Sequence, residues 1–133
     1  MTTRGIRGAT QTPANQPQAI YEATQDLLLA LLEANPGLTP QDIGSVFFTV
    51  SPDLNAAYPA LAARNLGWDL VPMLCAQEIA VPGGMERCIR VLLHWNTNLP
   101  QTAIRHVYLG ETARLRPDLA AQNLPLPALT PIE

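Results

Sequence analysis

The sequence predicts an α+β fold in which helices pack on one face of a mixed β-sheet. Apolar residues recur at helical spacing in one long segment, and several apolar runs have the length of β-strands. Strands and helices alternate in the first part of the chain, whereas strands follow one another in the second part, and this order favours a two-layer arrangement. At 133 residues and 47% hydrophobic, the chain has the size of one domain.

The first elements are a short strand and a long helix. We expect a strand from Arg4 to Thr10, followed by a loop rich in Pro, Asn and Gln. Asn15 is expected to cap the helix, Pro17 suits its first turn, and Asn35-Pro36-Gly37 ends it. The side chains at helical spacing are Ile20, Thr24, Leu27, Leu28 and Leu31.

The middle of the chain reads as turn, strand, turn and helix. Thr39 to Asp42 resembles a capping box that opens one helical turn, and Ile43 to Val50 is predicted to form a buried strand. Ser51-Pro52-Asp53 is a turn. A second helix is predicted from Tyr58 to Leu66, with Gly67 as its stop.

Three more strands are predicted in the second half. They span Leu70 to Leu74, Glu86 to Trp95 and Arg105 to Leu109, and a short helix near Ala113 follows. We therefore expect residues 1–116 to form a single domain. Residues 117–133 contain four prolines and little periodicity, and are expected to form an extended, mobile C-terminal arm.

Composition excludes several classes of function. A net charge of -3 and a pI near 5.3 give no electrostatic reason to bind nucleic acid or an anionic membrane, and no run is apolar enough to span a bilayer. Only 14% of residues are charged, which favours burial against identical subunits. Cys75 and Cys88 are not in a CxxC pattern, so we expect free thiols and a cytoplasmic protein.

Every basic side chain is an arginine, since the chain contains no lysine. Schiff-base chemistry, pyridoxal phosphate attachment and the lysine of a phosphate-binding loop are therefore excluded. The guanidinium group stays charged and binds carboxylates through two parallel hydrogen bonds. Amino-acid bias from a GC-rich genome is the alternative cause of the missing lysines, and the same mechanisms are excluded in either case.

Four polar residues stand in apolar strand contexts: Arg7, Glu78, Arg90 and Tyr108. An arginine within Cys88 to Leu93 is costly to desolvate unless an anion compensates it. Glu78 could be that anion in a structural ion pair. Alternatively, both side chains face a pocket and the partner of Arg90 is a ligand. The residues alone leave both interpretations open.

Seven separated segments resemble one known family. They are RGIRGAT from Arg4, SPDLNAAYPALAAR from Ser51, GW at Gly67, VPMLCAQE from Val71, CIRV from Cys88, IRHVYL from Ile104 and LRPDL from Leu115. In order and spacing they are similar to the monofunctional chorismate mutases of the trimeric pseudo-α/β-barrel class. Leu61 and Leu74 depart from the family pattern, in which lysine and threonine are expected.

The resemblance implies a Claisen rearrangement of chorismate to prephenate, in the biosynthesis of phenylalanine and tyrosine, without metal or cofactor. Arg90 would stabilise charge on the ether oxygen and Glu78 would accept a hydrogen bond from the ring hydroxyl. Arg7 and Tyr108 would hold a carboxylate, and Cys75 would line the same wall.

The resemblance also implies a homotrimer with its active sites between subunits. Arg64 and Arg116 would lie at the pocket rim, and the neighbouring subunit would contribute the side chains of Tyr58, Ala60, Arg64, Met73 and Leu74. Two alternatives remain at this point: a deaminase on a similar trimeric fold, and a non-catalytic trimer that binds an acid of the shikimate pathway.

Overall fold

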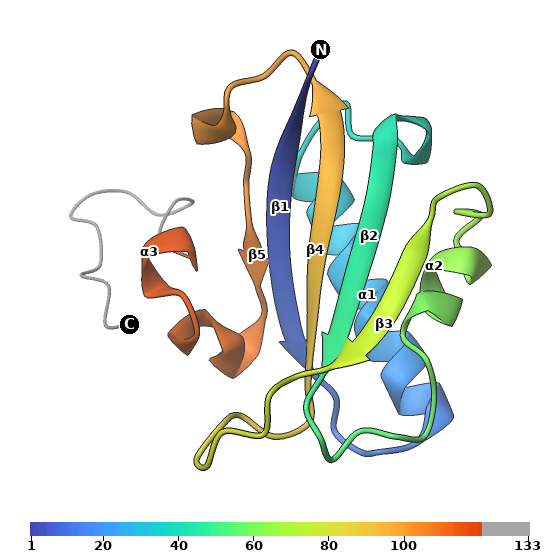
Figure 1. Cartoon of the computed structure of the whole chain (residues 1–133), viewed down its shortest axis with the longest axis vertical. Coiled ribbons are helices and arrows are strands. Elements are labelled where there is room, and N and C mark those ends of the chain that lie inside the picture. The colour runs from blue at the N-terminus through green and yellow to red at the C-terminus, as the bar shows by residue number, and fades with distance from the viewer. Residues whose placement is uncertain (121–133) are drawn as a thin grey trace.

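Five strands form one mixed sheet in the computed structural model, which describes residues 1–120. The strands lie in the order β3-β2-β4-β1-β5 (Figure 1). The central strand β4 is antiparallel to β1 and β2, whereas β3 is parallel to β2 and β5 is parallel to β1. Their bounds are β1 Thr2–Gln11, β2 Ile43–Val50, β3 Met73–Gln77, β4 Cys88–Thr97 and β5 Val107–Tyr108.

The two longer helices cover one face of this sheet, as predicted. Helix α1 (Pro17–Ala34) and helix α2 (Ala60–Asn65) lie behind the strands in Figure 1. Helix α3 (Pro117–Ala120) follows β5 at the other edge. The short 3₁₀ helices are η1 (Pro40–Asp42), η2 (Gln101–Ala103) and η3 (Gly110–Arg114).

The core lies between α1 and the sheet. Leu27, Leu28 and Leu31 of α1 are fully buried against β-strand side chains such as Ile6. The helix comes close to β1 because position 8 is a glycine: a Cβ there would meet side-chain atoms of Leu27 and Val91 at 3.1 Å. A small residue in β1 therefore sets the distance between helix and sheet.

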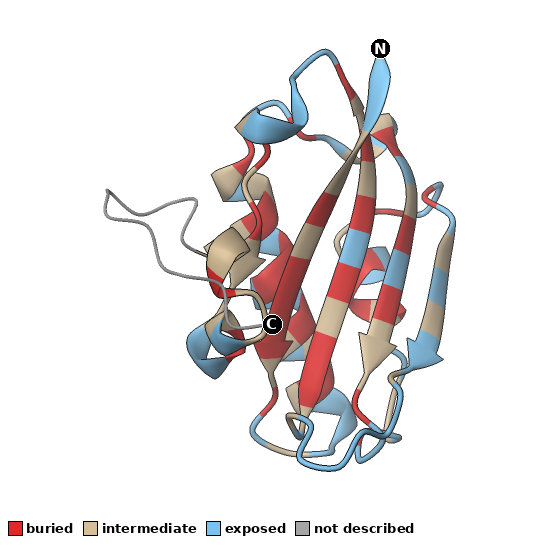
Figure 2. Ribbon diagram, turned by 60° about the vertical axis from the view of Figure 1, so that its left-hand side comes forward, coloured by how far each residue is buried: buried red, intermediate tan, exposed pale blue. Residues whose placement is uncertain are grey.

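Side chains alternate between the two faces of the sheet, and this decides where a site can lie. On β4, Val91, Leu93 and Trp95 are buried on the helix side, whereas Arg90 and Leu92 point to the opposite face and are more exposed. Figure 2 shows this alternation as buried, intermediate and exposed residues in bands of different colour along the strands. We call this second surface the open face.

Three details of the sequence prediction are wrong. The third strand is Met73–Gln77 and not Leu70 to Leu74, because Pro72 has no N–H to donate and Val71 closes a turn on the carbonyl of Trp68. The last strand has two residues instead of five. Helix α1 begins after Gln16 without a side-chain cap, and Asn15 instead accepts backbone N–H groups near position 55.

The expected C-terminal arm begins differently as well. Residues 117–120 form α3, so the start of the arm is helical and not extended. The rest of the arm, residues 121–133, lies outside the described residues, and its mobility stays a prediction.

Candidate active site

A hollow of about 390 Å³ opens on the open face of the sheet, across its central strands. Arg7 of β1 reaches it from one side, Arg90 of β4 lies in the middle, and Glu78 reaches it from just beyond β3. The strand register brings these segments together, because Arg90 pairs with Ala9 on one side and with Thr49 on the other. The remaining lining side chains are Phe47, Thr49, Val91 and Leu92.

Arg90 and Glu78 form a loose ion pair in this hollow. Arg90 Nε lies 3.8 Å from Glu78 Oε1, which is too long for a hydrogen bond, and about a third of each side chain is exposed. Glu78 is held instead by Thr49, whose Oγ1 donates to Oε1 at 2.8 Å. Within the described residues, the shielded Arg90 Nε has no hydrogen-bond partner. Arg90 therefore lines the hollow with one donor that is not satisfied by the described residues.

Arg7 and Tyr108 lie on the neighbouring strands β1 and β5, and Arg7 lines the hollow whereas Tyr108 does not. Tyr108 pairs with Ala9 of β1 through the parallel β1–β5 ladder, and its hydroxyl is shielded from solvent. The backbone N–H of Arg7 donates to His106 Nδ1 at 2.9 Å. We did not predict this contact, since 99 residues separate its partners and no local pattern signals it.

Arg116 is engaged by the first turn of α3. Its Nε and Nη2 donate to the two carboxylate oxygens of Asp118 at 3.0 and 2.8 Å. This two-point hydrogen bond lowers the pKa of Asp118. Arg116 therefore lies beyond β5 in a defined orientation, outside the set of residues that line the hollow.

Within one chain, Cys75 does not line the hollow that Arg90 lines. It pairs with the buried Phe48 on β2 and packs with the core on the helix side. It lines a second hollow of about 470 Å³, together with Tyr58 and Tyr21. Burial raises the pKa of the Cys75 thiol, which keeps it protonated near neutral pH.

The side chains expected from a neighbouring subunit gather at the β3 edge. Tyr58 and Leu74 are 74% and 65% exposed, Arg64 is exposed on α2, Met73 is half-buried, and Ala60 is buried. Tyr108 is on β5, at the opposite edge of the five-stranded sheet. Within a single chain, these five residues therefore lie at one edge of the sheet and Tyr108 lies at the other.

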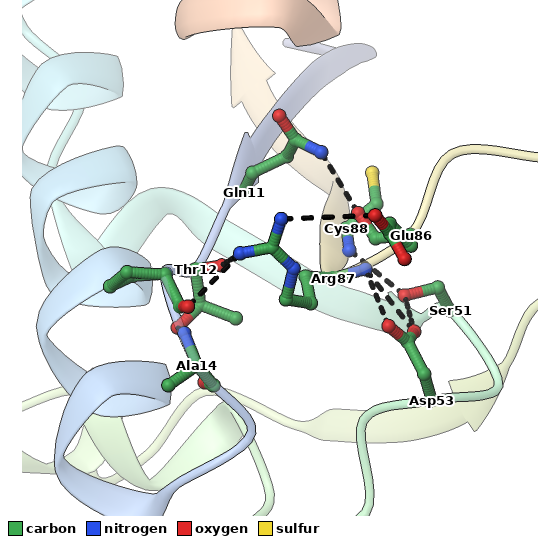
Figure 3. A network of polar contacts seen from close by, with 9 residues as sticks. Gln11, Thr12, Ala14, Ser51, Asp53, Glu86, Arg87 and Cys88 are labelled. Carbon is green, nitrogen blue, oxygen red and sulfur yellow. Dashed lines mark hydrogen bonds and ion pairs between the residues drawn. The ribbon is translucent and has the colours of Figure 1, made fainter.

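A polar network around Arg87 and Cys88 secures the beginning of β4 (Figure 3). Arg87 has a φ of 48°, and its N–H donates to both carboxylate oxygens of Asp53 at 2.9 and 3.2 Å. Its guanidinium binds the carbonyls of Thr12 and Pro13. Ser51 donates to Asp53 and accepts the N–H of Cys88. The loops after β1 and β2 thus hold the first residue of β4, Cys88, two positions before Arg90.

Residues 1–120 contain neither a membrane-spanning helix nor a cluster of metal-ligating side chains. None of the helices there is long and apolar enough to cross a membrane. In the same residues, no group of three or more His, Cys, Asp or Glu side chains is placed to hold a metal ion.

Comparisons with known proteins agree on one family. The family model for chorismate mutase type I matches residues 3–119. The chain is 53% identical to chorismate mutase AroH of Thermus thermophilus over 116 residues, which covers 87% of this chain and 95% of that protein. It is 44% identical to chorismate mutase AroH of Bacillus subtilis (strain 168) over 121 residues, covering 90% and 94%.

A solved structure, chorismate mutase from Clostridium thermocellum Cth-682, superposes with a TM-score of 0.79 at 48% identity, covering 81% of this chain and 96% of that one. The predicted fold class is thereby confirmed. The family model spans the strands and loops that build the hollow, and both relatives match over nearly their full length. The protein belongs to the chorismate mutase type I family.

Proposed function

We propose that the hollow lined by Arg7, Glu78 and Arg90 is where this chorismate mutase converts chorismate to prephenate. The activity, an isomerisation in aromatic amino acid biosynthesis, follows from the family and its relatives. One observation above all supports this location. The shielded Nε of Arg90 has no hydrogen-bond partner among residues 1–120. The nearby Glu78 carboxylate is 3.8 Å away and accepts its hydrogen bond from Thr49 instead.

Arg90 carries the rate enhancement in this proposal. The rearrangement breaks a carbon–oxygen ether bond, so negative charge grows on the ether oxygen as the transition state forms. A preorganised cation at that oxygen is worth about 3–4 kcal/mol, or roughly 10²- to 10³-fold in rate. The position of Arg90 in the central strand, between β1 and β2, supplies that preorganisation.

Glu78, Arg7 and Tyr108 orient the substrate. Glu78 accepts a hydrogen bond from the ring hydroxyl and places negative charge near the electron-poor ring, while its bond from Thr49 keeps the carboxylate in place. Arg7 and Tyr108 hold a carboxylate and favour the compact diaxial conformer, which is catalysis by orientation. No covalent bond forms between the protein and its substrate.

We further propose that the active protein is a homotrimer with each site shared between two subunits. The β3 edge, with Tyr58, Arg64 and Leu74, would meet the Tyr108 edge of the next copy and complete the rim together with Arg116. Met73, Ala60 and Cys75 belong to the same β3 side. Trimer formation would also cover large apolar side chains of the β3 edge, since Tyr58 and Leu74 are 74% and 65% exposed.

Two lesser parts of the proposal concern organisation and location. Residues 1–116 would form the catalytic domain, and the chain from Pro117 onward would lie over the site. A cytoplasmic location is supported by Cys75 and Cys88, which are both free thiols, as expected in a reducing compartment.

The test is conversion of chorismate by purified protein, with mass measured by light scattering. We expect turnover without added metal or cofactor, a mass of three chains, and loss of most turnover in Arg90→Ala with the mass unchanged. Turnover that persists in Arg90→Ala would place the site elsewhere. A fully active monomer would contradict the shared site.

A further inference from the structure

His106 lies buried at the junction of the two strands that carry Arg7 and Tyr108. It is 6% exposed, and its Nδ1 accepts the backbone N–H of Arg7 at 2.9 Å. The adjacent strand β5 is only two residues long and pairs with β1 at Gly8 and Ala9. The bond from Arg7 to His106 therefore adds one contact to the short β1–β5 ladder. This contact is at Arg7, whose side chain lines the hollow.

An imidazole can accept this bond only while Nδ1 carries no proton, so the neutral ring is required. The groups that face it maintain that state. Burial lowers the pKa of His106 below its ordinary value of 6.5, and the guanidinium groups of Arg7 on β1 and Arg116 before α3 lower it further. Asp118 of α3 acts in the opposite sense, with the weakest influence of the four. Near pH 7 the ring is therefore an acceptor at Nδ1.

We propose that His106 is a positioning residue, which joins β1 at Arg7 to β5 at Tyr108 through its Nδ1 acceptor and sets the spacing of the two groups that hold the substrate carboxylate. This inference rests on the proposed carboxylate-binding roles of Arg7 and Tyr108. Without the acceptor, the Arg7 N–H would lose its partner, and the link between β1 and β5 would lose one of the contacts that reinforce the pairing at Gly8 and Ala9 and the bond from Leu109 N–H to the Ala9 carbonyl.

Two uncharged amides distinguish the acceptor from the bulk of the ring. In His106→Asn the amide oxygen can occupy the place of Nδ1, whereas in His106→Gln the amide reaches the place of Nε2 and leaves Nδ1 unreplaced. We expect His106→Asn to keep kcat/KM within about threefold of wild type, and His106→Gln to raise KM about tenfold with a smaller change in kcat, since substrate holding is what weakens.

A double variant tests whether His106 acts through Arg7. If it does, the loss from His106→Gln largely disappears in the Arg7→Ala background, because the group being positioned is already gone. Circular dichroism and light scattering select folded variants of native mass. The inference would be overturned if His106→Asn and His106→Gln lowered kcat/KM equally. It would also be overturned if the fold-losses of Arg7→Ala and His106→Gln simply multiplied in the double variant. Failure of the wild type to convert chorismate would instead contradict the proposed function.

Discussion

Replacing Arg90 by alanine separates a catalytic arginine from a structural one. We expect kcat to fall by about 10²- to 10³-fold, because about 3–4 kcal/mol of transition-state stabilisation is lost with the guanidinium. Arg90→Lys should recover only a small part of this loss, since a lysine restores the charge without the rigid planar fork.

The same change should cost little folding stability. The contact between Arg90 and Glu78 is 3.8 Å long and both side chains are about a third exposed, so the pair is expected to contribute no more than about 1 kcal/mol. Glu78 keeps its hydrogen bond from Thr49 after the arginine is removed. A large rate effect with a small stability effect is therefore the predicted signature.

The assay follows the disappearance of chorismate under saturating conditions, in parallel with urea unfolding. Arg4→Ala is the matched control, because Arg4 also lies on the sheet but bonds the carbonyl of Leu99 at the far end. We expect its kcat to stay within about threefold of wild type. An Arg90→Ala protein that loses several kcal/mol of stability while its folded fraction turns over normally would refute the catalytic role.

Three further predictions address the surroundings of the site. Glu78→Gln should lower kcat at least about tenfold, since the negative charge facing the electron-poor ring is lost. The control is Glu33→Gln, on the exposed side of α1, which should change kcat little. If the two variants had the same kcat, Glu78 would take no part in the chemistry. Desolvation tends to raise the pKa of Asp53, but hydrogen bonds from Ser51 and the Arg87 N–H outweigh it and lower the pKa below 3.8. The ionised carboxylate therefore stabilises the fold above pH 3.8, and this stabilisation is lost as the pH falls through the lowered pKa. Asp53→Asn should therefore be less stable than wild type at pH 7, with a difference that shrinks under acid; thermal melts that differ equally at pH 7 and pH 3 would contradict this. Gly8→Ala should destabilise by about 1–3 kcal/mol in urea, because the new methyl group meets Leu27 at 3.1 Å, and an unchanged midpoint would show that the helix can move away.

Strong periodicity made the long elements predictable. Helix α1 and strand β2 are where the sequence places them, and β4 begins and ends two residues later than predicted; each carries enough apolar side chains to show its period. Strand β3 was misplaced because it is an edge strand with an exposed, mixed pattern, while the apolar residues before it form a turn. Strand β5 is too short for a pattern to mark its ends.

The polar residues of the site could be predicted as candidates from the sequence. Their distances from one another, and the face of the sheet on which each lies, could not. Arg90 and Glu78 stood out because charge is costly in an apolar run, but their 3.8 Å separation depends on a register that joins three strands. Cys75 is three residues from Glu78 in sequence, yet strand alternation turns it to the other face. The contact of His106 with Arg7 has no local signal at all.

The most direct test of the shared site mixes two damaged subunits. Arg90→Ala and Arg64→Ala proteins, each nearly inactive alone, are unfolded together, refolded at equal amounts and assayed for chorismate conversion. If each site takes Arg90 from one subunit and Arg64 from its neighbour, about a quarter of the sites regain both arginines, and activity returns to about a quarter of the wild-type level. A mixture no more active than its two components would contradict the account, because both arginines would then have to come from the same chain.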